Sequence, residues 1–222
     1  MKQFSKIEIQ DLGLWKKKQG QKRPLYSFDL ELTPRCNLNC RHCYINLPPN
    51  HTIAQAQELS LQEIEAIADQ AVALGAVWVL LTGGEPLLRP DFEAIYLMLK
   101  RKGLLVSVFT NVTLIRQRHL DLFNKYPPRD IETTIYGSRA EIYERVTRKP
   151  GSFSSFQHGL NALIDAGVKV RLKAMALRSN LEDLDAISAY GKQFTKDFYR
   201  FDPVLHLRYD RDEARNEEIR SE

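Results

Sequence analysis

The chain has 222 residues, of which 43% are hydrophobic and 27% are charged, and its formal net charge is +4. This composition supplies enough apolar side chains for a core, so it excludes a disordered chain, a collagen-like repeat and a small disulfide scaffold. No apolar run approaches the roughly 20 residues of a membrane span, and the N-terminus lacks the apolar segment of a secretion signal. We therefore expect a cytoplasmic protein with no membrane partner.

The two ends of the chain differ from the middle in charge. A short basic run, Lys16–Lys18 with Lys22 and Arg23, precedes the first strand-like segment. We interpret residues 1–25 as a solvated basic arm, and we expect no nucleic-acid partner. Residues 208–222 are strongly charged without an apolar stripe and indicate a connector. A single core domain over residues 26–207 is expected between them.

Strand-like and helix-like segments alternate along the core. Apolar and polar residues alternate over 26–32, as in a half-covered strand. A capping box at Ser60 and Glu63 begins a helix that ends at Gly75. The apolar run 77–81 is typical of a strand buried on both faces. A helix over about 92–102 and a strand over 104–109 follow.

The pattern repeats in the second half of the core. We expect a helix over 117–124, a strand over 131–135, a helix capped by Ser152 and ending at Gly167, a strand over 168–177, a helix over 181–193 and a strand over 198–207. Six strands separated by helices require right-handed crossovers and a parallel sheet. The predicted fold class is α/β, either a doubly wound sheet or an incomplete barrel.

All three cysteines of the chain, Cys36, Cys40 and Cys43, fall within eight residues directly after the first strand. That position is the carboxyl edge of the sheet, where α/β proteins place their chemistry. An odd and tightly clustered set in a cytosolic chain argues against disulfides and for a metal. Three thiolates from one short loop fit one face of a [4Fe–4S] cluster and leave one iron open to another ligand.

A zinc ion with His42 or His51 as the fourth ligand is the alternative. Zinc sites usually combine two pairs of ligands, and the chain has no second cysteine pair. The other interpretation of His42 is a ring that packs beside the cluster and a bound ligand.

A second motif, Gly83-Gly84-Glu85-Pro86, follows the second strand directly and lies at the same edge. Glycines let the main chain approach a ligand, and a carboxylate beside them can hold an ammonium group. Alone, the motif is typical of a strand-to-helix turn. Together with the cysteine loop it indicates a ligand site.

The spacing Cys36-x3-Cys40-x2-Cys43, the Gly-Gly-Glu-Pro motif and the later Thr110-Asn111 closely resemble the radical S-adenosylmethionine (radical SAM) enzymes. The resemblance implies a partial (β/α)6 TIM-like barrel. It also implies that the cysteines ligate a [4Fe–4S] cluster whose open iron chelates S-adenosylmethionine. Reduction by a donor such as flavodoxin or ferredoxin would then yield methionine and a 5′-deoxyadenosyl radical, which abstracts a substrate hydrogen.

The resemblance also assigns residues to the cofactor. Gly83, Gly84 and Glu85 would bind the methionyl ammonium group, and His42 stands where the family usually has an aromatic ring beside the adenine. No catalytic residue is assigned beyond the cluster.

Three further assignments rest on position at strand ends. Asn111, Thr134 and Lys173 would reach the ribose and the carboxylate of S-adenosylmethionine. Thr134 is equally well interpreted as a plain β-branched strand residue. Val112 departs from the family, which often has Thr-Asn-Gly here.

Within the family, Leu32–Cys36, Tyr44 and the segment Tyr136–Phe153 look like the branch that modifies peptides, whose members usually carry a SPASM domain with auxiliary clusters. No cysteine follows Cys43, so we expect no auxiliary-cluster domain in this chain. Its charged end favours a chain that stops before such a domain over a protein that works without one.

The expected function is radical modification of a ribosomally synthesised peptide, with an accessory peptide-recognition protein as a further partner. The alternatives are a radical SAM enzyme for a small metabolite or cofactor precursor, and a non-catalytic metal-binding module.

Overall fold

The computed structural model describes residues 25–194, 199–202 and 208. Its six strands form one parallel sheet in sequence order. They are β1 (Ser27–Glu31), β2 (Trp78–Thr82), β3 (Leu105–Phe109), β4 (Asp130–Ile135), β5 (Val170–Met175) and β6 (Tyr199–Asp202). A doubly wound sheet reverses its strand order at a switch point, and this sheet does not. The α/β class is confirmed, and the sequential order is that of an incomplete barrel.

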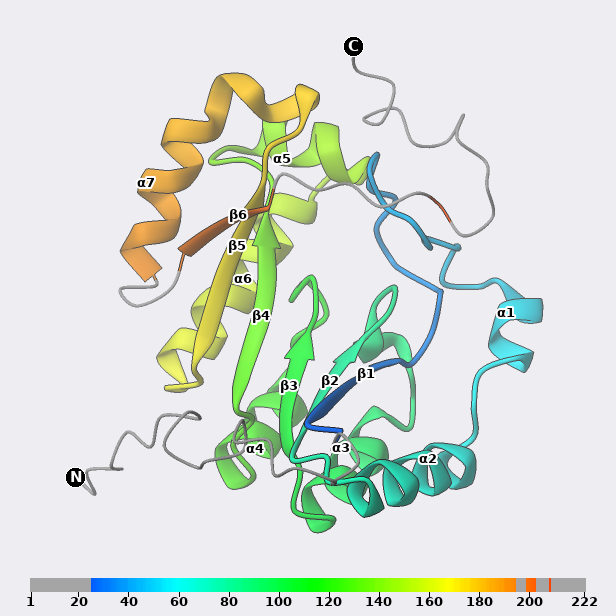
Figure 1. The fold of residues 1–222 in the computed structure, drawn as a ribbon. Coiled ribbons are helices and arrows are strands. Elements are labelled where there is room, and N and C mark those ends of the chain that lie inside the picture. Colours follow the sequence, from blue (N-terminus) through cyan, green and yellow to red (C-terminus); the bar gives the residue numbers. More distant parts are fainter. Residues whose placement is uncertain (1–24, 195–198, 203–207, 209–222) are drawn as a thin grey trace, which may run out of the picture.

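The helices lie on the outer side of the curved sheet, except α1, which lies on the long connection between β1 and α2 (Figure 1). They are α1 (Thr52–Ala56), α2 (Leu61–Ala73), α3 (Phe92–Arg101), α4 (Gln117–Lys125), α5 (Ala140–Thr147), α6 (Ser152–Asp165) and α7 (Leu184–Phe194). Two 3-10 helices, η2 (Pro86–Leu88) and η3 (Arg178–Asp183), complete the described elements. Within the described ranges β1 pairs only with β2 and β6 only with β5, so the barrel is open between β1 and β6.

The elements expected from the sequence are found with small shifts in their bounds. The last expected helix begins three residues later, at Leu184, because η3 occupies the residues before it. Helices α1 and α5 were not expected. Residues 198 and 203–207 of the last expected strand, most of the basic arm and most of the charged connector lie outside the described residues.

The core lies between the sheet and the helices. Alternate strand residues point outward and are fully buried, among them Val79, Leu81, Val106, Val108, Ile131 and Leu172. They pack against apolar residues of the helices such as Ile95, Leu99, Phe156 and Leu160. The expectation that β2 is buried on both faces is wrong for its inner face, where Leu80 lines a cavity. A parallel strand is covered twice only where helices flank both faces, and here they flank one.

The inner face below that cavity is polar, and its side chains contact one another. The Ser107 hydroxyl donates to Asp130 Oδ1 over 2.6 Å and accepts a 3.1 Å hydrogen bond from the Trp78 indole. Asp130 also lies 3.4 Å from the guanidinium groups of Arg129 and Arg171. These contacts fill the barrel beneath the cavity and leave its carboxyl end open.

Two helix starts test the capping predictions. Ser60 accepts from the Glu63 N–H, and the Glu63 carboxylate accepts from the Ser60 N–H over 2.8 Å, so the predicted capping box is confirmed. Ser152 is not a cap, because Gly151 takes the N-cap position with a left-handed φ of 77°. The Ser152 hydroxyl instead pairs with the Thr147 hydroxyl at 2.7 Å.

Candidate functional site

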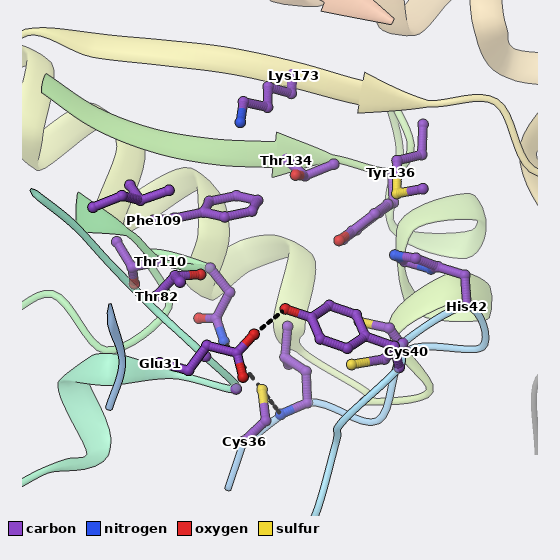
Figure 2. A pocket seen from close by; sticks show the side chains of 18 of the residues that line it. Glu31, Cys36, Cys40, His42, Thr82, Phe109, Thr110, Thr134, Tyr136 and Lys173 are labelled. Carbon is purple, nitrogen blue, oxygen red and sulfur yellow. Dashed lines mark hydrogen bonds between the residues drawn. The ribbon is translucent and has the colours of Figure 1, made fainter. Parts of the chain in front are cut away.

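A cavity of about 490 Å³ opens at the carboxyl ends of the strands, a volume within the range of small-molecule sites. It is lined by Asp29, Glu31, Leu80, Thr82, Phe109, Thr134, Lys173 and Met175 from the strands, by Cys36, Leu38, Cys40, His42, Cys43 and Tyr44 from the loop after β1, and by Gly83, Gly84, Thr110, Asn111 and Tyr136 from the turns after β2, β3 and β4. Figure 2 shows Lys173 and Thr134 across the cavity from Cys36.

Nine of the ten residues singled out in the sequence line this one cavity, and Glu85 is the exception. The strand register explains why residues far apart in sequence meet. Thr134 and Lys173 are direct partners across β4 and β5, and Glu31 and Thr82 are partners across β1 and β2. Side chains of paired residues in parallel strands point to the same face, which here is the interior.

The cysteine loop is held by the C-terminal end of α5. The N–H of Asn39 donates to the Thr147 carbonyl, and the N–H of Arg41 donates to the Val146 carbonyl, both over 3.0 Å. The last carbonyls of a helix lack partners within the helix, so they are available as acceptors. This helix, which the sequence analysis missed, therefore supports the loop around Cys40.

A buried ion pair fixes the residue before the first cysteine. Arg35 binds both oxygens of Glu58, with Nε 2.7 Å from Oε1 and Nη2 3.1 Å from Oε2, and it donates from Nη1 to the Pro49 carbonyl over 2.8 Å. The two side chains are 6% and 8% exposed. A bidentate pair of this kind fixes direction as well as distance, so the entry to the loop is rigid.

The thiols lie in an environment that opposes a bare negative charge. Burial raises the pKa of Cys36 to about 12, and the nearby Glu85 carboxylate adds to the rise. Burial also raises the pKa of Cys40 and of Cys43. Such thiols become thiolates where bound cations compensate the charge, as the irons of a cluster do. These cysteines are therefore suited to ligation rather than to service as free nucleophiles.

The arrangement of the donors fits a cluster better than a single ion. Among the residues that the structure describes, no three or more His, Cys, Asp or Glu side chains converge as a lone ion requires. A cubane takes each thiolate on a different iron, so three thiols lining one cavity suit it. His51, considered as a zinc ligand, instead caps α1, where its Nδ1 accepts from the Ala54 N–H over 3.1 Å.

His42 lines the cavity beside an aromatic ring. Its imidazole lies 5.0 Å from the Tyr136 ring, between centroids, at an angle of 54°. Burial lowers the pKa of His42 to about 4, so the ring is neutral near pH 7. A neutral imidazole next to a tyrosine offers a flat, weakly polar wall to a base.

The two glycines are required by the protein itself. A Cβ on Gly83, whose φ is +120°, would lie 2.5 Å from the Thr33 carbonyl oxygen. The N–H of Gly84 donates to that same oxygen over 2.7 Å. The turn after β2 therefore packs directly on the residues that lead into the cysteine loop. The glycines were predicted to let the main chain approach a ligand. The structure shows that they also let it pack closely on the backbone of Thr33.

Glu85 is fully buried and its carboxylate is occupied by the protein. Oε1 accepts from the Thr110 hydroxyl over 2.7 Å and from the Leu87 N–H over 3.0 Å, and Oε2 accepts from the Asn111 N–H over 2.8 Å. Burial raises the pKa of Glu85 to about 7, although these three hydrogen bonds oppose the rise. The side chain joins the ends of β2 and β3. Its predicted contact with an ammonium group stays a prediction.

Asn111 joins the end of β3 to the cysteine loop. Its amide nitrogen lies 3.7 Å from the Cys36 sulfur and donates to Asn37 Oδ1 over 2.9 Å. Val112, which replaces the family's glycine, keeps a glycine-like left-handed φ of 56° and is fully buried. That conformation is strained for a β-branched residue, so packing maintains it.

Lys173 and Thr134 lie on the wall of the cavity across from Cys36, and their predicted contacts with S-adenosylmethionine stay predictions. The Lys173 ammonium group pairs with Glu132 and lies 4.6 Å from the centre of the Phe109 ring.

The sequence analysis missed Glu31, whose carboxylate accepts a hydrogen bond from the Tyr44 hydroxyl over 2.8 Å at the exposed side of the cavity. Its place on the inner face follows from the alternation along β1, where residues 29 and 31 share a face.

Comparison with known proteins gives the family. A model of the radical SAM superfamily matches residues 30–189. The chain belongs to the radical SAM superfamily. Its predicted membership is confirmed, and the members of this family are enzymes.

Curated relatives carry several names. The subtilosin biosynthesis protein AlbA of Bacillus subtilis is 27% identical over 86% of this chain and 44% of its own length. An AdoMet-dependent heme synthase of Methanosarcina barkeri is 30% identical over 73% of this chain and 46% of its own length. A probable GTP 3′,8-cyclase of Aeropyrum pernix is 31% identical over 70% of this chain and 44% of its own length. The chain thus spans less than half the length of these relatives.

Solved structures confirm the partial TIM-like barrel. SuiB of Streptococcus suis bound to S-adenosylmethionine matches 84% of this chain and 44% of its own, with a TM-score of 0.64 and 16% identity. The protein anSMEcpe with bound AdoMet matches 80% of this chain and 51% of its own, with a TM-score of 0.66 and 16% identity. In the described part of this radical SAM chain, no helix is long and apolar enough to cross a membrane.

Proposed function

We propose that this chain binds a [4Fe–4S] cluster through Cys36, Cys40 and Cys43 and cleaves S-adenosylmethionine reductively. The supporting observation is that the three thiols share one cavity with the backbone of Gly83 and Gly84 and with polar side chains from the ends of β3, β4 and β5. When bound, the reduced cluster supplies the electron that breaks the sulfonium C–S bond, which leaves methionine and a 5′-deoxyadenosyl radical.

The residues of the chain bind, orient and shield. His42 and Tyr136 form the wall against which the adenine would lie. Lys173, paired with Glu132, lines the cavity, where its cation would bind a carboxylate. The buried turns after β2 and β3 form part of the cavity wall at the carboxyl ends of the strands and would shield the reacting atoms from water.

The test is anaerobic reconstitution with iron and sulfide, followed by dithionite and S-adenosylmethionine. The expected products are 5′-deoxyadenosine and methionine in equal amounts. Alanine at Cys36, Cys40 or Cys43 should abolish the reducible cluster absorbance and the products. Asn50→Ala is the control, at an exposed residue of the same loop between β1 and α1. It should keep both the cluster absorbance and the products. A cluster that forms without any 5′-deoxyadenosine would indicate a non-catalytic metal-binding module.

We propose a ribosomally synthesised peptide as the substrate. Support comes from the name of AlbA and from fold neighbours solved with peptides, SuiB with the precursor peptide SuiA and anSMEcpe with Kp18Cys. The test adds short peptides encoded next to the gene, with and without a co-encoded accessory protein, under reduced ferredoxin or flavodoxin. The expected result is a mass change in one peptide together with more 5′-deoxyadenosine.

A small metabolite or cofactor precursor is the second candidate, because the heme synthase and GTP cyclase relatives are 30% and 31% identical to this chain. The same assay with an iron porphyrin precursor or with GTP separates the two. Substrate-dependent 5′-deoxyadenosine with either compound, and none with peptides, would favour this candidate.

A further inference from the structure

One residue far from the cysteine motif in sequence contacts the cysteine loop. Arg208 is 4% exposed, and it is the one residue beyond β6 that the structure describes. Its Nη1 donates to the backbone carbonyl of Cys43 and to Oδ1 of Asn46, both over 2.7 Å. These partners lie 165 and 162 positions earlier in the chain.

Asn46 carries this contact further into the loop. Its amide nitrogen donates to Asn39 Oδ1 over 2.8 Å and to the Cys40 carbonyl over 3.3 Å, and the residue is 4% exposed. The guanidinium group fixes which end of the Asn46 amide is the acceptor, so the nitrogen must face Cys40. Arg208 thereby acts on the carbonyls of two of the three cysteines, one directly and one through Asn46.

The charge of Arg208 bears on the same loop. The guanidinium group is buried and its Nη1 lies 2.7 Å from the carbonyl oxygen of Cys43, so a positive charge lies against the Cys40–Cys43 turn. A cluster with three thiolates gains one negative charge when it is reduced. A buried cation beside it favours the reduced form, because electrostatic attraction is weakly screened in a buried site.

We propose that Arg208 is a positioning residue for the cluster, which keeps the Cys40–Cys43 turn in its ligating shape and makes the cluster easier to reduce. The proposal rests on the proposed cluster ligands and goes beyond them, since neither the cysteine motif nor the Gly-Gly-Glu motif includes this residue. It implies that the cysteine loop is completed by the part of the chain that follows the last strand.

The experiment compares three variants with the unchanged chain after anaerobic reconstitution. Arg208→Ala removes both the hydrogen bonds and the charge. Asn46→Ala removes the bridge to Cys40 and leaves the charge in place. Arg178→Ala, at an exposed arginine of η3, is the control for loss of one positive charge elsewhere. The measurements are the rate of iron loss to a chelator and the midpoint potential of the cluster by EPR-monitored titration.

Arg208→Ala should lose iron about 10-fold faster, the lower bound for removing a group that orients metal ligands. It should also show a more negative midpoint potential. Asn46→Ala should lose iron faster while its potential stays near that of the unchanged chain. Arg178→Ala should change neither. If Arg208→Ala fails to fold, Arg208→Lys keeps the cation and should keep the potential while losing iron faster.

Equal iron-loss rates and potentials in Arg208→Ala and Arg178→Ala would overturn the proposal. Both measurements are independent of turnover. Failure of the proposed function would appear separately, as a stable cluster that gives no 5′-deoxyadenosine in the unchanged chain.

Discussion

A Cβ atom on Gly84 would lie 2.2 Å from the backbone carbonyl oxygen of Arg35. That carbonyl accepts a 2.8 Å hydrogen bond from the N–H of Glu85. The motif after β2 and the residue before the first cysteine are therefore in direct backbone contact. Any side chain at Gly84 has to displace the start of the cysteine loop.

Gly84→Ala should destabilise the fold by about 1–3 kcal/mol, as overpacking against rigid backbone does, and should reduce the iron content after reconstitution. Urea unfolding and iron analysis measure the two effects. Gly103→Ala is the control, because its φ of +81° costs about 1–2 kcal/mol while nothing lies within 4 Å of the added Cβ. That variant should keep its iron. Equal iron contents in the two variants would contradict the prediction.

The stability of the cluster-free chain should depend on pH through Glu85. Its pKa is raised by burial from 4.5 to about 7, so the folded chain binds more protons than the unfolded chain between these values. Stability should therefore fall as the pH rises through this window, by up to about 3 kcal/mol, and then level off. Urea unfolding between pH 5 and pH 8 measures it. Glu85→Gln should remove this part of the slope, and parallel curves for the two proteins would refute the assignment.

Lys173 should have a structural role that can be separated from ligand binding. Lys173→Met leaves the Glu132 carboxylate buried, with Arg171 at 3.6 Å as a more distant cation, and should cost about 3 kcal/mol. The double variant Lys173→Met with Glu132→Gln should recover most of that stability. If Lys173 also binds the carboxylate of S-adenosylmethionine, the double variant stays stable but binds it weakly by calorimetry. Full affinity in the stable double variant would exclude the ligand role.

His42 should contribute stacking rather than ligation. His42→Phe keeps a flat ring and should bind S-adenosylmethionine as the unchanged chain does. His42→Ala should bind it roughly 10-fold more weakly, since base–aromatic stacking is worth about 1–3 kcal/mol. Equilibrium dialysis measures both affinities. Iron content should be the same in both variants, and iron loss in His42→Phe would show that the imidazole is a ligand.

The strands could be predicted from the sequence because each depends on local pattern. Strands such as β2 are short apolar runs, and the three cysteines line one cavity because they lie within one loop. Helix α5 was missed although Ile142, Tyr143 and Val146 recur at helical spacing and are fully buried. The start of this helix carries no capping signal in the sequence. Its N-cap residue is Arg139, which makes no side-chain cap hydrogen bond.

The orientation of Glu85 could not be predicted in the same way. A carboxylate after two glycines at a strand end suggests a ligand contact, but its partners here are Thr110 and Asn111, which belong to the next strand's end. Only the three-dimensional arrangement shows that these donors reach it. The bond from Arg208 to the cysteine loop is a similar long-range contact that no local pattern indicates.

The open side of the barrel has a consequence for solubility. Within the described chain β1 has one strand neighbour, so its other edge carries unpaired backbone groups of the kind that seed edge-to-edge aggregation. Asp29 and Glu31 are exposed on this strand. Two copies that joined along β1 would bring these carboxylates together, and their repulsion would oppose the association. The same two acids that line the cavity would thus oppose pairing of the protein with itself.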